Sequence, residues 1–129
     1  MAFSNYLEDQ ITRWISGTTF DAAPANTFVQ LYSQDPTDSG SATGALYTRV
    51  SVAAGSWTRG TNGVGTLTNT NVITITSSAA SGATATHVAV FDSSTGGNML
   101  ISGALASSKT IVTGDEVRFN ATSLTLTVA

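Results

Sequence analysis

The feature that most constrains the fold of this chain is the contrast between its first 16 residues and all that follows. Residues 4–16 (SNYLEDQITRWIS) carry apolar side chains at helical spacing, whereas the rest consists of short Thr- and Val-rich runs separated by Gly, Ser and Asn. Apolar residues that recur every three or four positions predict a helix, and short β-branched runs between turn residues predict strands. The sequence therefore predicts one N-terminal helix that leads into an all-β body.

The predicted helix over residues 4–16 has clear start and stop signals. Ser4 or Asn5 can cap its first turn, and Gly17 is a natural stop. Its apolar face consists of Leu7, Ile11, Trp14 and Ile15. Because a helix of about 12 residues is marginal alone in water, we expect this face to be buried. Two partners fit it: the sheet of its own domain, or a neighbouring subunit.

Residues 27–129 are predicted to form the β body. Strands are expected over 27–33, 46–53, within 71–77, over 86–92, 99–105 and 110–112, from Asp115 onward, and over 123–128. The segments 34–45 and 54–70 are predicted to be long loops. About seven or eight short strands at this spacing are typical of an antiparallel β-sandwich or a partly closed barrel. The length of 129 residues fits a single domain, 1–129.

Composition excludes several classes of function. The formal net charge is -3 and the five basic residues are scattered, so clustered phosphate contacts to nucleic acid are not expected. The chain has no cysteine, which rules out disulfides and thiolate metal sites. Glu8 and Asp9 interrupt what would be the apolar part of a signal peptide, and no apolar run approaches the roughly 20 residues of a membrane span.

No constellation of residues predicts catalysis, a metal site or a cofactor. His87 is the only histidine, and a half-buried side chain bonded to a neighbour is the preferred interpretation over a catalytic triad. Asp35 and Asp38 lie in a Gly- and Ser-rich loop that lacks the alternating oxygen ligands of a calcium loop. The Gly-rich stretches 60–65 and 94–98 lack the Lys and the helix of a phosphate loop.

Trp57 and Arg59 are the bulkiest side chains of the predicted loop 54–70. Trp57 fits three roles: a plug for its own loop, a contact with another subunit, or a stacking surface for a sugar ring. Together with the helix face, they complete the set of candidate interface residues: Leu7, Ile11, Trp14, Ile15, Trp57 and Arg59.

The sequence also resembles small structural proteins of tailed bacteriophages. These share the opening Met-Ala-Phe-Ser-Asn-Tyr-Leu-Glu at 1–8, a Tyr-x-Arg strand, and a Phe-Asp-x-x-x-Gly-Gly-Asn-x-Leu hairpin. The matching residues after the opening are Tyr47, Arg49, Phe91, Asp92, Gly96, Gly97, Asn98 and Leu100. The resemblance implies a non-enzymatic virion component that is assembled in the host cytoplasm. Its first implied role is capsid decoration (cement) on the major capsid protein; the alternative is a tail- or fibre-associated protein, with binding of a host receptor or glycan.

Self-association is expected from the strand edges. Isolated sheets usually protect their edges with charges, yet this chain has one Lys, and its last predicted strand, 123–128, carries no charge. We therefore expect copies of the chain to cover one another in a closed symmetric assembly. Resemblance to capsid decoration proteins puts a trimer first, with a dimer as the alternative.

Overall fold

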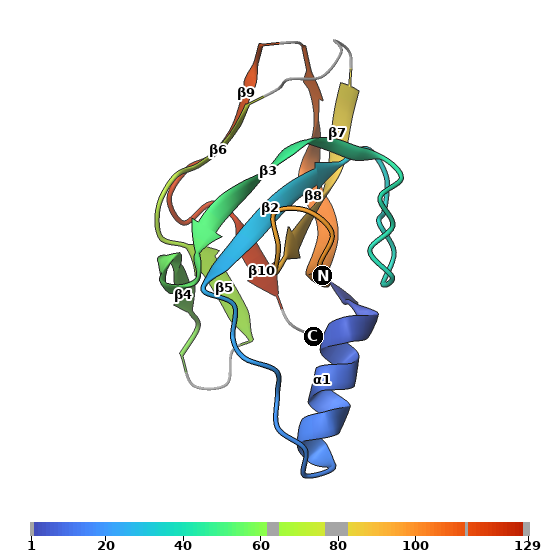
Figure 1. Cartoon of the computed structure of the whole chain (residues 1–129). Helices are drawn as coiled ribbons and strands as arrows, with labels where there is room; N and C mark the ends of the chain where they lie inside the picture. The colour runs from blue at the N-terminus through green and yellow to red at the C-terminus, as the bar shows by residue number, and fades with distance from the viewer. Residues whose placement is uncertain (1, 62–64, 77–82, 113, 128–129) are drawn as a thin grey trace.

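The computed structural model describes residues 2–61, 65–76, 83–112 and 114–127, and these form a sandwich-like assembly of antiparallel strands with one N-terminal helix (Figure 1). In chain order the elements are β1 (Ala2–Phe3), α1 (Asn5–Ile15), β2 (Asn26–Tyr32), β3 (Ala45–Ala53), a 3-10 turn (Ala54–Ser56), β4 (Trp57–Arg59), β5 (Thr66–Asn69), β6 (Ile73–Thr76), β7 (Ala83–Phe91), β8 (Met99–Ile111), β9 (Glu116–Phe119) and β10 (Thr125–Thr127). The predicted all-β class is confirmed.

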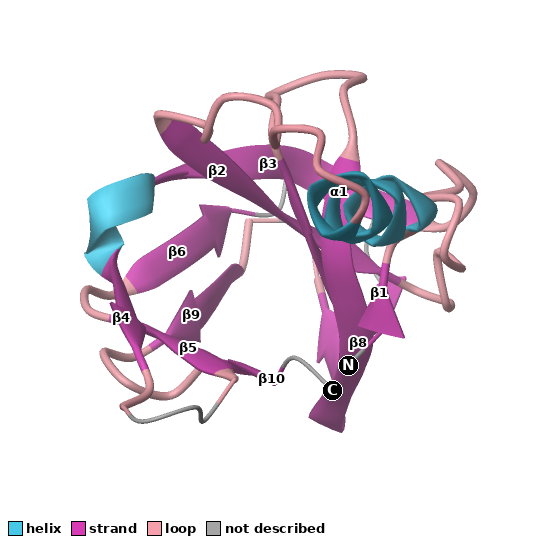
Figure 2. Cartoon of the chain, turned by 90° about the horizontal axis from the view of Figure 1, so that it is seen from below, coloured by secondary structure: helices cyan, strands magenta, loops and turns pink. Residues whose placement is uncertain are grey.

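The strands form three antiparallel groups. The largest sheet has the order β1-β8-β7-β2-β3, a second has the order β10-β5-β4, and β6 pairs with β9. Viewed from below, β2, β3 and β8 of the largest sheet lie on one side and the short strands β5, β6, β9 and β10 on the other (Figure 2). The space between them holds the main hydrophobic core.

The main core takes side chains from all three groups of strands. Its buried members are Val29, Leu31, Val52, Ile73, Ile75, Ala85, Val88, Val90, Ile101, Ile111, Val117, Leu124 and Leu126. Strand β2 shows how the sequence builds this core. Val29 and Leu31 point into it, whereas Phe28 and Tyr32 belong to a second cluster. Alternation along a strand sends successive side chains to opposite faces, so β2 is covered on both.

The second cluster comprises Tyr32, Ala89, Phe91 and Met99, with Phe28 packed against it. Arg49 of β3 reaches over this cluster, and its Nη1 donates hydrogen bonds to the carbonyl oxygens of Ser93 (2.7 Å) and Gly96 (2.8 Å). The hairpin that joins β7 to β8 is thereby held against the sheet.

Several predicted boundaries differ from the structure. A short strand, β1, precedes the helix and pairs with β8, so the β body does not begin at residue 27. Residues 54–70 contain β4 and β5 in addition to loop, because β5 is paired on both sides, with β4 and β10. A turn was predicted between 99–105 and 110–112, but β8 runs without a break from Met99 to Ile111. Its pairing with β7 shifts register here: Ala104 pairs with His87 and Lys109 with Ala85, so residues 105–108 bridge the shift without partners on β7.

Candidate interaction site

The helix α1 begins and ends as its sequence predicts. Ser4 is the N-cap, and its Oγ accepts a hydrogen bond from the backbone N–H of Leu7 (3.1 Å). Glu8 lies in the first turn and Arg13 in the last, where each complements the helix dipole. Beyond the C-terminus, Gly17 adopts a positive φ of 87°, the left-handed conformation that commonly ends a helix.

Among the described residues, α1 is joined to the β body at its N-terminal end. The backbone N–H of Ser4 donates to the carbonyl of Leu100 (3.1 Å), and that of Asn5 to the carbonyl of Asp38 (2.9 Å). From there the helix extends away from the sheets, and the segment 16–25 returns alongside it (Figure 1). The C-terminal half of α1 therefore projects from the molecule.

A set of polar contacts around Asp21 ties this returning segment to the helix. The Asp21 carboxylate accepts hydrogen bonds from the Tyr6 hydroxyl (3.1 Å), from Gln10 Nε2 (2.9 Å) and from Arg13 Nη1 (3.1 Å). The Asp21 backbone N–H in turn donates to Gln10 Oε1 (2.8 Å). Hydrogen bonds from Tyr6 and then Arg13 lower the pKa of Asp21, while burial and the bond to Asp21 raise the pKa of Tyr6. We call this group (Tyr6, Gln10, Arg13, Asp21) the Asp21 clamp.

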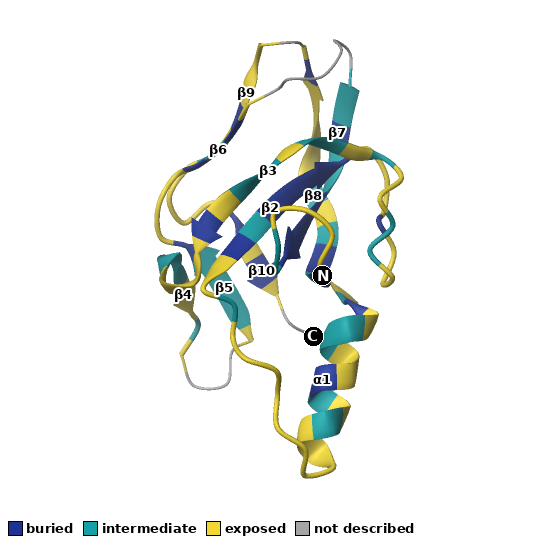
Figure 3. Cartoon of the chain, in the orientation of Figure 1, coloured by how far each residue is buried: buried dark blue, intermediate teal, exposed yellow. Residues whose placement is uncertain are grey.

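The clamp explains why the second half of the helix face is not buried within its own chain. The buried residue of α1 is Gln10, whereas Leu7 and Ile11 are half-buried. Trp14 is 62% exposed and Ile15 is 73% exposed (Figure 3). The helix presents its polar edge to the returning segment and leaves the end of the apolar face, at Trp14 and Ile15, exposed. Docking on the sheet of the same chain is thus excluded for Trp14 and Ile15, and docking on a neighbouring subunit stays a prediction.

Phe20 of the returning segment joins these two residues. Its ring is 49% exposed and stacks on Trp14, with centroids 6.2 Å apart and ring planes 20° apart. We call Trp14, Ile15 and Phe20 the helix tip. These are three of the five large hydrophobic side chains that are exposed in the described part of the chain; the others are Val72 and Val112. Sequence analysis missed Phe20, although it is the one large apolar side chain in residues 17–25.

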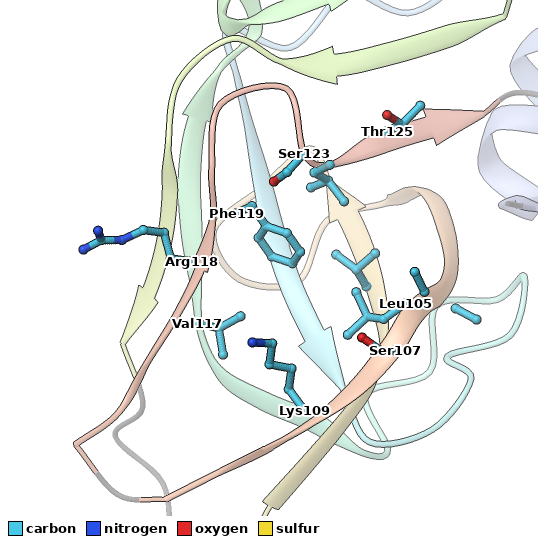
Figure 4. Close-up of a pocket in the computed structure, with 12 residues that line it drawn as sticks. Leu105, Ser107, Lys109, Val117, Arg118, Phe119, Ser123 and Thr125 are labelled. Carbon is cyan, nitrogen blue, oxygen red and sulfur yellow. The ribbon is translucent and has the colours of Figure 1, made fainter.

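A second feature is an apolar cleft of about 430 Å³ between β8, β9 and the segment that leads into β10 (Figure 4). Its walls include five apolar side chains: Val88, Leu105, Val117, Phe119 and Leu124. In Figure 4, Lys109 of β8 lies at the cleft beside Val117, whereas Arg118 points away from it. Sequence analysis missed the cleft, because its β8 wall lies in and beside the stretch that was predicted to turn.

Asn69 fixes the wall of this cleft that leads into β10. This residue is 1% exposed, and its Nδ2 donates to the carbonyls of Asn71 (2.8 Å) and Asn120 (2.9 Å). Its Oδ1 accepts from the backbone N–H of Leu124 (2.9 Å). One side chain thus satisfies backbone groups on both sides of the turn at 120–123, and it positions Leu124 in the cleft.

Trp57 and Arg59, the other interface candidates, lie on β4. The Trp57 ring is half-buried against the main core, and its Nε1–H donates to the Thr27 hydroxyl (2.9 Å). Arg59 is exposed. The structure does not bring either residue to the helix tip, and the plugging role is the one that the contacts of Trp57 match.

The polar residues that were considered for chemistry have ordinary structural partners. His87 Nδ1 is 2.8 Å from the Thr86 hydroxyl, and an Asp35 carboxylate oxygen accepts from the backbone N–H of Thr37 (2.8 Å) in a local turn. Among the described residues, no three or more His, Cys, Asp or Glu side chains gather where they could hold a metal ion.

Comparison with known proteins shows the family to which the chain belongs. No helix in the described segments has the length and apolar character needed to cross a bilayer. No curated protein matches the chain. The family of the podophage GP4 fiber I protein gp80 matches residues 2–127. Because that match covers nearly the whole sequence, the chain belongs to this family of small structural proteins of tailed phages.

Proposed function

We propose that this chain is a fibre-associated structural protein of a phage virion, and that it acts without catalysis by binding other virion proteins. The observation that carries the proposal is the match of residues 2–127 to the family of a podophage fibre protein. That match favours the tail or fibre alternative over the capsid decoration role that the sequence resemblance put first.

The helix tip supports a role in attachment. Trp14, Ile15 and Phe20 are large, exposed and held in place by the Asp21 clamp and the Ser4 cap. Aromatic side chains with little freedom to move are favourable anchors at protein interfaces, because little conformational entropy is lost when they bind. In this proposal the β body is the rigid support and the helix tip makes the contact.

Binding of a host receptor or glycan through Trp57 is not favoured. The indole ring packs on the main core and its N–H is already bonded to Thr27, so little of it is available to stack on a sugar. Arg59 alone offers no such surface.

Labelling intact virions tests the location. Gold-conjugated antibody against the chain, viewed by electron microscopy, is expected at the tail or fibre end in a few copies per particle. The matched control is the same antibody after adsorption with purified protein. Dense label over the head, or loss of heat resistance by capsids that lack the protein, would contradict the fibre role and return the chain to the capsid surface.

A further inference from the structure

We infer that the helix tip of one copy docks in the apolar cleft of a second copy of the same chain. The contact would be head-to-tail, because it joins two different surfaces of the molecule. This inference deepens the proposed function and rests on it, since it names the partner through which the structural protein assembles.

The helix tip of one copy cannot reach the cleft of its own chain. Hydrogen bonds from Ser4 and Asn5 fix the start of α1 on the β body, and the helix then runs away from the sheets (Figure 1). The cleft lies between β8, β9 and β10. In the described part of the chain both surfaces are therefore left open on each copy, and a second molecule can cover them.

The size and the chemistry of the cleft fit the side chains of the helix tip. A cavity of about 430 Å³ lies in the range of roughly 300–1,000 Å³ that encloses small ligands, so it has room for an indole ring and a neighbouring aliphatic side chain. Its walls combine aliphatic side chains with the Phe119 ring, which is directed into it (Figure 4), and with the polar residues Ser107, Lys109, Arg118, Ser123 and Thr125. Trp14 and Ile15 are large apolar groups of the kind that fill such a cavity at the centre of an interface.

Charges of opposite sign lie beside the helix tip and at the cleft. On α1, Glu8 lies seven residues before Ile15 and therefore on the same side of the helix, beside the apolar face, where it is exposed. Lys109 lies at the cleft, is exposed, and makes no ion pair among the described residues. A tip seated in the cleft can bring the Glu8 carboxylate near the Lys109 amine, which would fix the direction in which the helix enters.

Head-to-tail contacts have a consequence that symmetric contacts lack. Each copy uses its tip on one neighbour and its cleft on the other, so the contact generates a ring if the rotation closes and an open filament if it does not. A closed trimer, the state expected from sequence resemblance, is one such ring.

Mixing two defective variants is the decisive experiment. Trp14→Ala removes the anchor of the tip, and Leu105→Asp places a charge in the cleft. Light scattering and native mass measurement of the purified proteins at micromolar concentration should show that each variant alone loses self-association by about tenfold or more in apparent Kd. An equimolar mixture should form a dimer and nothing larger, because one good tip meets one good cleft. Val72→Ser, which removes an exposed apolar side chain elsewhere, is the control and should assemble as the wild type does.

A charge exchange tests the orientation and does not depend on how well the cleft variant folds. Glu8→Lys and Lys109→Glu should each weaken self-association, and the double variant should recover it. Asp9→Lys makes the same change in the same turn of α1 but away from the apolar face, so it should have little effect.

Three results would overturn the inference: a strictly monomeric wild type across micromolar concentrations, tip variants that fail to assemble while Leu105→Asp assembles normally, or no dimer from the mixture although circular dichroism shows both variants folded. The second result would point to a contact of the tip with another tip or with another surface of the same chain. These measurements use purified protein, so they can fail while the virion labelling still places the chain at the fibre, and the reverse also holds.

Discussion

The guanidinium carbon of Arg49 lies 3.5 Å from the centroid of the Phe91 ring, so a charged side chain of β3 stacks directly on the second hydrophobic cluster. The same guanidinium donates to two carbonyls of the hairpin between β7 and β8. A flat group with several N–H donors can do both at once, which the ammonium of lysine cannot. Arg49 therefore joins β3, β7 and this hairpin.

Replacing Arg49 tests that role. Arg49→Lys keeps the charge but loses the stacking and part of the hydrogen bonding, so we expect the free energy of unfolding to fall by about 1–3 kcal/mol. Urea denaturation followed by tryptophan fluorescence measures the change. Arg59→Lys, at an exposed arginine of β4, is the matched control and should shift stability by less than about 0.5 kcal/mol. Equal effects in the two variants would show that the Arg49 contacts contribute nothing particular.

Replacing glycines inside and outside the same hairpin should give graded losses of stability. At Gly97, which has a φ of 67°, an added Cβ would lie 2.5 Å from Asp92 Oδ1 and 2.5 Å from Ser93 Cβ. At Gly96 the φ is 56° but the surrounding space is open, and at Gly55 the space is also open and no positive φ occurs. We expect Gly55→Ala to be near neutral, Gly96→Ala to cost about 1–2 kcal/mol from the left-handed backbone, and Gly97→Ala to cost more. Thermal melting of the three variants gives the order, and any other order would contradict the backbone geometry described here.

The Asp21 clamp predicts a dependence of stability on pH. Hydrogen bonds from Tyr6 and Arg13 lower the pKa of Asp21 below the value of about 3.9 expected in the unfolded chain. The folded state therefore binds fewer protons there, so the stabilisation is present above that value and is lost as the pH falls through the folded pKa. Melting temperatures of the wild type and Asp21→Asn should differ above about pH 5 and converge toward pH 2.

Two controls separate the clamp from general acid denaturation. Asp9→Asn removes an exposed carboxylate of α1 outside the clamp and should leave the pH profile of the wild type in place. Tyr6→Phe removes the first hydrogen bond to Asp21 and should reduce the difference without abolishing it. If Asp21→Asn shows the same acid transition as the wild type, the clamp does not contribute to acid stability.

Local signals in the sequence predict the helix and most strands but not how they pack. The Ser4 cap, the Gly17 stop and the strand expected over residues 27–33 rest on short-range patterns, and each appears in the structure close to where it was expected. Burial of Trp14 and Ile15 was predicted from amphipathicity alone, which indicates that a face is apolar but not what covers it. The position of the helix, and with it the exposure of Trp14 and Ile15, depends on a contact between Gln10 and Asp21. These two polar residues lie eleven positions apart, and no apolar pattern reveals their contact.

Strand β8 shows a second limit of structure prediction from the sequence alone. Residues 106–109 (ASSK) have turn chemistry on their own, yet they continue the strand across a register shift because residues on both sides of them pair with β7. Strand preferences depend strongly on neighbouring strands, so this error follows from reading the segment in isolation. The cleft was missed for the same reason, because part of one wall lies in that stretch.

Asn69 carries the last prediction, because the shape of the cleft depends on its side chain. The residue is almost fully buried and bonds the backbone of Asn71, Asn120 and Leu124. Asn69→Leu has a similar size but leaves those groups without partners, and an unsatisfied buried polar group costs about 1–3 kcal/mol, so we expect a loss of several kcal/mol in urea unfolding. Asn69→Asp keeps the acceptor for Leu124 but loses the hydrogen bonds that Nδ2 donates, so it should be destabilised as well.

The matched control is Asn71→Ala, since Asn71 is exposed and only its backbone carbonyl takes part. That variant should lie within about 0.5 kcal/mol of the wild type. If Leu124 is positioned through Asn69, then Asn69→Asp should also weaken self-association at protein concentrations and temperatures where circular dichroism shows it folded. A folded Asn69→Asp variant with unchanged assembly would mean that this wall of the cleft does not contact the neighbouring copy.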